Sequence, residues 1–320
     1  MRRHPFYLIA VFSLVINSSH GQVIDNTASF RNTQGEKYFR FHYENDFFSA
    51  ADWYYSQGVN LEFVHPALKK FPLSKLLIHP KLENSKYGIA VEQDVYTPTS
   101  IRHDEILKRD RPYAGVLLLK TFLVANDSIK KLRFTSNLSI GVVGSAAGGK
   151  ETQTSIHEWT GNFLPLGWQH QVKNDVAINY QVGLEKNIIS KKFFLLNFCG
   201  DVRAGTLKDK VSTGLVGMAG LFDSPFHSGN KRKKFRVHIY DQPLVSAIGY
   251  DATLQGGLFN KKSDYTISAR NLTRATFQNS FGIVFNIGKI NLEYFQSFLT
   301  KEFKSGDSHN WGGIRMAIVM

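Results

Sequence analysis

The residues best suited to chemistry begin near position 40, where polar and apolar side chains alternate. Between Tyr38 and Asp46, aromatic residues at 39, 41 and 43 alternate with Arg40, His42, Glu44 and Asp46. A period of two indicates a β-strand with one apolar and one polar face. Facing solvent, the polar side would be unremarkable. Facing the inside of a closed barrel, it would line the lumen with acids, bases and metal-binding groups, and this is the arrangement we expect.

A second group of candidates lies in a segment that lacks this alternation. Residues 151–163 follow Gly148-Gly149 and end before Pro165, and they predict a short helix. Gln153 and His157 are four positions apart, so both project from one helix face. A histidine titrates near neutral pH and can act as a general base. An exposed helix surface would also accommodate both residues.

The elements that position these residues belong to an exported chain. Arg2 and Arg3 precede a short apolar run over residues 6–16, and small residues follow before Gln22. This pattern predicts a secretory signal peptide over residues 1–21, because the apolar run is too short for a membrane helix. Without repeats or a Pro- or Ser-rich linker, residues 22–320 are expected to form a single domain.

Composition narrows the fold class. Aromatic residues make up 13% of the chain, there is a single cysteine, and no later stretch resembles a membrane helix. An aromatic-rich exported chain of alternating segments indicates either an outer-membrane barrel or a soluble β-sandwich. About a dozen strands are expected, mostly long enough to cross a bilayer at a tilt. They are the opening run to 47, and 59–63, 87–96, 115–123, 132–142, 178–185, 194–201, 213–222, 235–241, 244–256, 263–269, 274–287, 289–299 and 309–320.

The formal charge of the chain is +13. Such a surplus favours a polyanionic partner, either nucleic acid or the phosphates of an anionic lipid. Because the signal peptide predicts export, a lipid is the better candidate and nucleic acid is not expected.

Seven short motifs, in order along nearly the whole mature chain, carry a family resemblance. They are Glu44-Asn45-Asp46, Asp52 to Gly58, Tyr96-Thr97-Pro98, Asp110 to Gly115, Gln153-x-x-x-His157, Gly167-Trp168-x-x-Gln171 and Tyr250 to Gly256. Together they resemble the outer-membrane lipid A deacylases of the LpxR type. The resemblance implies an all-β, antiparallel transmembrane barrel of twelve strands, and calcium-dependent hydrolysis of the 3′-linked acyloxyacyl ester of lipid A. It also implies a site inside the barrel wall near the outer leaflet.

Carried over to this chain, the resemblance implies a set of site residues. The catalytic candidates are His157, Gln153, Asn45, Ser56 and Arg111, and the metal ligands are Asp46 and Asn45. The family has a further acidic residue shortly after the histidine, whereas this chain runs Glu158 to Phe163. Glu158 would point off the shared helix face, so Asp175 is the later candidate for this metal ligand.

Each assignment has a simpler alternative. Asn45-Asp46 offers the hard oxygen ligands that calcium takes, but an Asn-Asp pair is also common in turns. Ser56 is interpreted as a polar contact, because no nucleophile elbow surrounds it. Arg111 can bind a lipid A phosphate or the oxyanion, or form a salt bridge in the lumen.

The predicted function is therefore ester hydrolysis by a His157-activated water at a calcium-polarised carbonyl, in an outer-membrane barrel that we expect to be a monomer. Two alternatives remain open. One is a non-catalytic barrel, either a channel or a structural protein. The other is a hydrolase of the same mechanism that acts on phospholipid acyl esters.

Overall fold

The computed structural model describes residues 24–28, 35–49, 53–224, 226 and 235–320. The predicted signal peptide at 1–21 lies outside these residues. Within the described ranges, no helix is both long and apolar enough to cross a bilayer.

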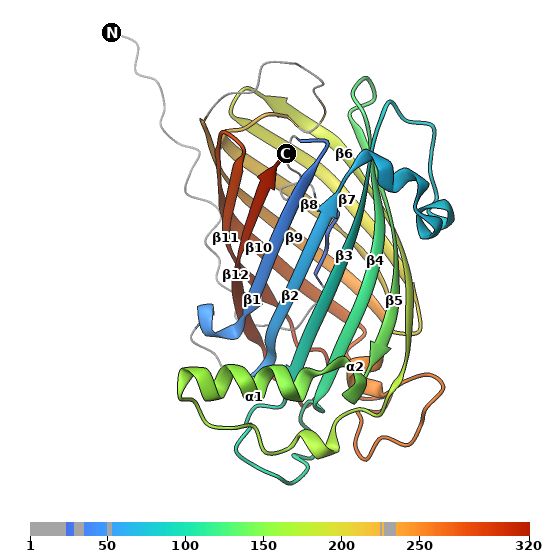
Figure 1. The fold of residues 1–320 in the computed structure, drawn as a ribbon, viewed down its shortest axis with the longest axis vertical. Coiled ribbons are helices and arrows are strands. Elements are labelled where there is room, and N and C mark those ends of the chain that lie inside the picture. Colours follow the sequence, from blue (N-terminus) through green and yellow to red (C-terminus); the bar gives the residue numbers. More distant parts are fainter. Residues whose placement is uncertain (1–23, 29–34, 50–52, 225, 227–234) are drawn as a thin grey trace.

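The described residues form a closed barrel of twelve antiparallel strands, as expected (Figure 1). Each strand pairs with its neighbours in sequence, and the last strand pairs with the first, so no sheet edge remains open. The strands are β1 (Tyr38–Asn45), β2 (Tyr54–Val64), β3 (Asn84–Thr97), β4 (Ala114–Asp127), β5 (Leu132–Val143), β6 (Asp175–Lys191), β7 (Phe194–Gly205), β8 (Lys208–Leu221), β9 (Phe235–Asp251), β10 (Ala275–Ile287), β11 (Ile290–Leu299) and β12 (His309–Val319).

Two strand predictions were wrong. The segments 235–241 and 244–256 form the single strand β9, which runs through Pro243 and ends at Asp251. Proline has no N–H to donate, and the ladder between β8 and β9 is interrupted at residues 242–243, so the strand tolerates it there. Residues 263–269 form no strand and belong to a long loop.

The predicted helix at 151–163 is α1 (Gly149–Thr160). It ends early because Gly161 adopts a left-handed conformation with φ of 70°. The remaining helices are short: α2 (Ala252–Gln255), η2 (Asp46–Ser49), η3 (Pro66–Lys70), η4 (Pro72–Leu76), η5 (Ser145–Ala147) and η6 (Trp168–His170).

The two faces of the barrel wall differ in polarity. Arg40 and Glu62 point into the lumen, where both are buried and form an ion pair at 3.0 Å. The intervening outward residues are apolar and exposed, such as Phe39 at 42% and Leu61 at 45%. A polar lumen within an apolar outer belt is the pattern of a barrel that spans a membrane.

The two ends of the barrel also differ. Tight turns at 128–131, 192–193 and 288–289 and the longer 65–83 connection join strands at one end. The long connections at 98–113, 144–174 and 252–274 and the tight turn at 206–207 lie at the other. In outer-membrane barrels the turns are periplasmic and the long loops extracellular. Helix α1 therefore lies at the extracellular end.

Candidate active site

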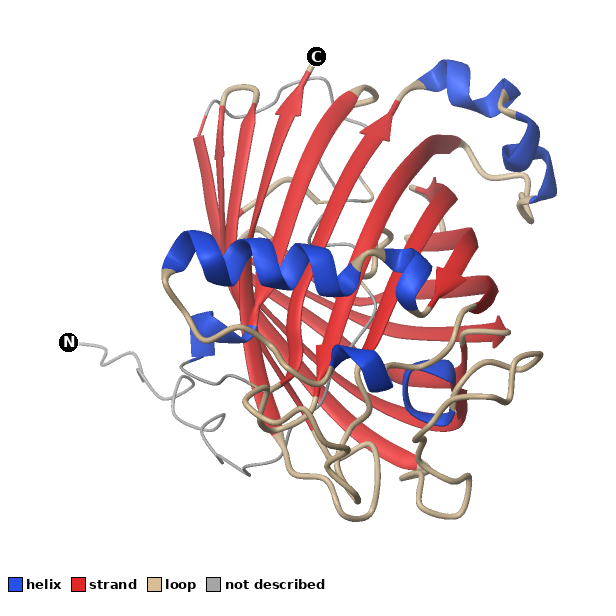
Figure 2. Ribbon diagram, turned by 60° about the horizontal axis from the view of Figure 1, so that its bottom comes forward, coloured by secondary structure: helices blue, strands red, loops and turns tan. Residues whose placement is uncertain are grey.

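Helix α1 lies across the outside of the barrel wall, in front of β1 to β4 (Figures 1 and 2). One wall residue in contact with this helix is Gln93 of β3. Glu92 and Asp94, on either side of it, are buried in the lumen, so the alternation along the strand directs Gln93 outward. Thr152 donates a hydrogen bond to the Gln93 amide oxygen at 3.0 Å, and the Gln93 amide donates to the Ala147 carbonyl at 2.6 Å. Helix α1, with Gln153 and His157, therefore lies on the outer side of the wall and not in the lumen, where the polar face of the first strand had led us to expect the site.

The helix can approach the wall this closely because of two glycines. A Cβ on Gly149 would lie 3.2 Å from the Gly115 Cα in β4, and a Cβ on Gly115 would lie 3.2 Å from the Ala147 Cβ. Both separations are tighter than ordinary packing allows, so a side chain at either position would push the start of α1 away from the wall.

Gln153 lies between α1 and the wall. Its side chain is buried, and its amide oxygen accepts a 2.8 Å hydrogen bond from the Trp168 indole N–H. Trp168 is in turn held in an apolar cluster with Val95, Ile101 and Tyr113. The Gln153 Nε2 has no hydrogen-bond partner within the described part of the chain. The site thus holds a fixed amide with an available donor.

His157 is oriented by the main chain that follows the helix. Its Nδ1 lies 2.6 Å from the Phe163 carbonyl oxygen. A carbonyl can only accept, so Nδ1 carries the proton and Nε2 has a lone pair available to act as a base. The turn at Gly161 brings Phe163 back to this position, and Arg102 stacks on the Phe163 ring at 3.7 Å. The Phe163 carbonyl therefore fixes the orientation of His157.

Asn45 and Asp46 lie where β1 ends and η2 begins. The Asn45 amide oxygen accepts from the Phe47 N–H at 2.7 Å, which is an Asx turn that directs the chain into η2. Helix η2 folds onto the outer face of β11 and β12, where the Phe48 carbonyl accepts a hydrogen bond from Gln296. Asp46, the first residue of η2, is buried. Asn45 thus serves as the turn residue considered above, and it starts η2 at Asp46.

Ser56 sits at an irregularity in the pairing of β2 with β3, where its hydroxyl is 2.7 Å from that of Thr97. Within the described residues, Ser56 bonds to a hydroxyl and not to a base, which agrees with a polar contact and not a nucleophile.

Gln57 is a candidate that the sequence motifs did not identify. In the strand register it stands opposite Asn45 on one side and Val95 on the other. These residues face outward, yet Gln57 is only 2% exposed, while Leu61 on the same strand face is 45% exposed. Its Nε2 has no hydrogen-bond partner among the residues that the structure describes. The alternation along the strand could have predicted that Gln57 points outward beside Asn45. Its burial depends on the tertiary structure, and no sequence pattern signals it.

Arg111 is not brought to this group. It forms an ion pair with Glu302 and donates to the Thr253 hydroxyl at 2.6 Å, and its guanidinium lies over the Tyr96 ring. Tyr96 points into the lumen, where it contacts Tyr55. Arg111 therefore occupies the lumenal salt bridge that was its alternative assignment.

Asp175 is also apart from α1 and anchors a loop. Its carboxylate accepts hydrogen bonds from the backbone N–H groups of Phe259 at 2.7 Å, Asn260 at 2.9 Å and Val176 at 2.7 Å. These bonds hold the 252–274 loop against the start of β6.

The donors that could hold a metal are few. The described ranges contain no group of three or more His, Cys, Asp and Glu side chains that could bind an ion together. The buried Asp46 carboxylate next to the Asn45 amide oxygen supplies hard oxygen donors, which suit calcium better than a transition metal. The donor set therefore fits calcium in kind, with a single carboxylate among the candidate ligands near α1.

The fold and the site define an outer-membrane β-barrel with a covered polar site on its outer wall. The family model "Outer membrane protein LpxR" matches residues 8–320. The chain therefore belongs to the LpxR family.

One solved structure agrees with this assignment at the level of fold. LpxR from Salmonella typhimurium superposes with a TM-score of 0.72 at 18% identity, covering 88% of this chain and 100% of that one. The β domain of the Bordetella autotransporter BrkA gives a TM-score of 0.46 at 7% identity, covering 90% of this chain and 100% of that one. A search of curated protein sequences found no match.

Proposed function

We propose that this protein is a lipid A deacylase that hydrolyses the 3′-linked acyloxyacyl ester with a water activated by His157. Membership of the LpxR family supports the reaction class. The observation that carries the assignment of roles is the 2.6 Å contact between His157 Nδ1 and the Phe163 carbonyl, because it leaves Nε2 as the base.

In the proposed reaction, His157 Nε2 takes a proton from water as the water oxygen attacks the ester carbonyl. The buried amide groups of Gln153 and Gln57 donate hydrogen bonds to the resulting oxyanion. When the intermediate collapses, the acyl–oxygen bond breaks and the protonated His157 returns its proton to the sugar oxygen. The products are the free acyloxyacyl acid and a 3′-hydroxyl.

Calcium is part of the proposal. Asp46 and Asn45 would hold the ion, which when bound supplies Lewis-acid polarisation of the ester carbonyl. The chain's own contribution is the Asx turn at Asn45, which starts η2 at Asp46.

The surroundings of α1 suit a lipid substrate. Exposed apolar side chains surround the site at the extracellular end: Phe47 at 80%, Trp159 at 88%, Phe163 at 63% and Leu166 at 51%. Aromatic side chains at a membrane surface favour the interface between headgroups and acyl chains. The site thus faces the layer in which the ester bonds of a lipid lie.

The test is deacylation of lipid A by cells or vesicles that contain the His157→Ala variant, followed by mass spectrometry of the extracted lipid. Loss of the base should reduce the rate by about 10²- to 10⁴-fold. His79→Ala is the matched control, because His79 lies in the connection between β2 and β3 at the opposite end of the barrel. Full activity of an assembled His157→Ala barrel would contradict the proposal. Mass spectrometry of the phospholipids in the same extracts tests the alternative, in which phospholipid acyl esters are the substrate.

A further inference from the structure

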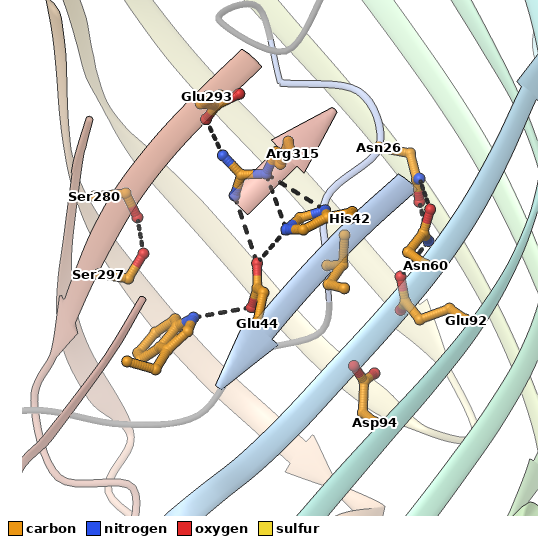
Figure 3. Close-up of polar contacts among 12 residues, drawn as sticks. Asn26, His42, Glu44, Asn60, Glu92, Asp94, Ser280, Glu293, Ser297 and Arg315 are labelled. Atoms are coloured by element: carbon orange, nitrogen blue, oxygen red, sulfur yellow. Dashed lines mark hydrogen bonds and ion pairs between the residues drawn. The ribbon is translucent and has the colours of Figure 1, made fainter. Parts of the chain in front are cut away.

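The residues before the first strand enter the barrel. Ile24, Asn26, Thr27 and Ala28 are each no more than 5% exposed, and their hydrogen-bond partners are lumenal residues of the wall. Figure 3 shows Asn26 inside the barrel next to Asn60 of β2.

One side of the segment is bound by β2. The Asn26 amide donates to the Asn60 oxygen at 3.0 Å and to the Glu62 carboxylate at 2.7 Å. Asn60 in turn donates to Glu92 of β3 at 2.7 Å. Asn26 therefore completes a row of buried polar groups, which would cost free energy if its members lacked partners.

Two cations bind the backbone of the segment. Lys120 of β4 donates to the Ile24 carbonyl at 2.8 Å, and Arg133 of β5 donates to the Thr27 carbonyl at 2.7 Å. Each cation also has a carboxylate partner, Glu92 at 2.5 Å for Lys120 and Glu185 at 3.6 Å for Arg133. The wall thus supplies the partners that an unpaired backbone needs when it is buried.

Little space remains beside the segment. Its other side borders a cavity of about 60 Å³, lined by Ile24, Thr27 and residues of the far wall such as Gln181 and Gln242. By this measure a water needs about 10–15 Å³, so the cavity holds only a few waters. At this level the segment and the wall side chains together leave little more than this cavity in the lumen.

We propose that Ile24–Ala28 is a resident plug, bound at a dedicated site on β2, β4 and β5, that closes the lumen to solutes. The plug lies inside the wall, whereas α1 and the candidate active site lie outside it. Closure is therefore a property of the barrel separate from ester hydrolysis.

The test is the conductance of the purified protein in planar lipid bilayers. The wild type should remain closed, and a variant lacking residues 22–34 should show discrete openings with at least a tenfold rise in ion flux. A second variant, with residues 24–28 all replaced by glycine, keeps the chain length and removes the Asn26 contacts, and it should also open. The fold of each variant is checked by its heat-dependent mobility on a gel.

Either of two results would overturn the proposal. One is a wild type that conducts as well as the folded variants. The other is a pair of correctly folded variants that both stay closed.

Discussion

At the scale of single residues, the candidate site is described by which polar atoms already have a hydrogen-bond partner. Asn45 is engaged in an Asx turn, Ser56 with Thr97, and His157 Nδ1 with the Phe163 carbonyl. The Nε2 atoms of Gln153 and Gln57 have no hydrogen-bond partner among the described residues. In the proposed reaction, His157 Nε2 is the base and these two amide groups are the donors to the oxyanion.

Gln57→Leu tests the residue that the motifs missed. Loss of one oxyanion donor should reduce kcat by roughly 10²- to 10³-fold, with a smaller change in KM, because the bond strengthens as negative charge develops. Gln278→Leu is the control, since Gln278 is equally buried but lies in the lumen, where it bonds to Ser280. Equal kcat values for the two variants would remove Gln57 from the site.

Substitutions of Asp46 and Asp175 are expected to change the calcium requirement of the reaction differently. Chelation should abolish deacylation, and added calcium should restore it. Asp46→Asn should raise the calcium concentration needed for half-maximal activity by at least tenfold, because it removes the carboxylate that the proposal assigns to the ion. Asp175→Asn should leave that concentration unchanged, since its carboxylate anchors the 252–274 loop. A calcium titration of activity distinguishes the two, and the reverse ranking would reassign the ligand to Asp175.

At the scale of elements, the end of α1 controls the base. Gly161 adopts φ of 70°, and the turn it forms places the Phe163 carbonyl against His157. The position of the helix itself follows from close packing at Gly115 and Gly149. The helix therefore contributes through both of its ends: the first fixes its distance from the wall, and the second fixes the tautomer of its histidine.

Gly161→Ala should lower kcat/KM by about tenfold. An L-residue in the left-handed region costs roughly 1–2 kcal/mol, and a tenfold rate change corresponds to about 1.4 kcal/mol. Gly288→Ala is a matched control, because Gly288 has φ of 57°, and a Cβ at either glycine would meet nothing within 4 Å. Gly288 lies in the β10–β11 turn at the far end. Similar activity losses in both variants would mean that general strain, and not the His157 contact, is the cause.

At the scale of the whole molecule, the lumen is a network of paired charges. His42 and Glu44 of β1 meet at 2.8 Å, and Arg315 of β12 joins them and pairs with Glu293 (Figure 3). Arg111 forms another buried ion pair with Glu302 and joins the 98–113 loop to the 300–308 loop. We therefore expect these pairs to contribute to the stability of the barrel.

Arg111→Met should therefore lower stability more than activity. Removal of one partner from a buried ion pair typically costs about 3–5 kcal/mol, here moderated by Lys208, which lies 3.4 Å from the same Glu302. The measurement is the free energy of unfolding in urea for protein in lipid vesicles, with the exposed Lys108→Met as control. A variant with unchanged stability and no deacylation would instead support the assignment of Arg111 to substrate binding.

The sequence by itself determined most of the strands, the helix with Gln153 and His157, and the lumenal placement of Arg40, His42 and Glu44. These follow from local periodicity, which records which face of an element is buried. Only the tertiary structure decided that α1 lies outside the wall, that Gln57 is covered, that Arg111 and Asp175 bind elsewhere, and that Ile24–Ala28 is buried against the inner wall. Periodicity assigns a side chain to a face, but what covers that face depends on contacts between residues far apart in the chain, and no local pattern encodes them.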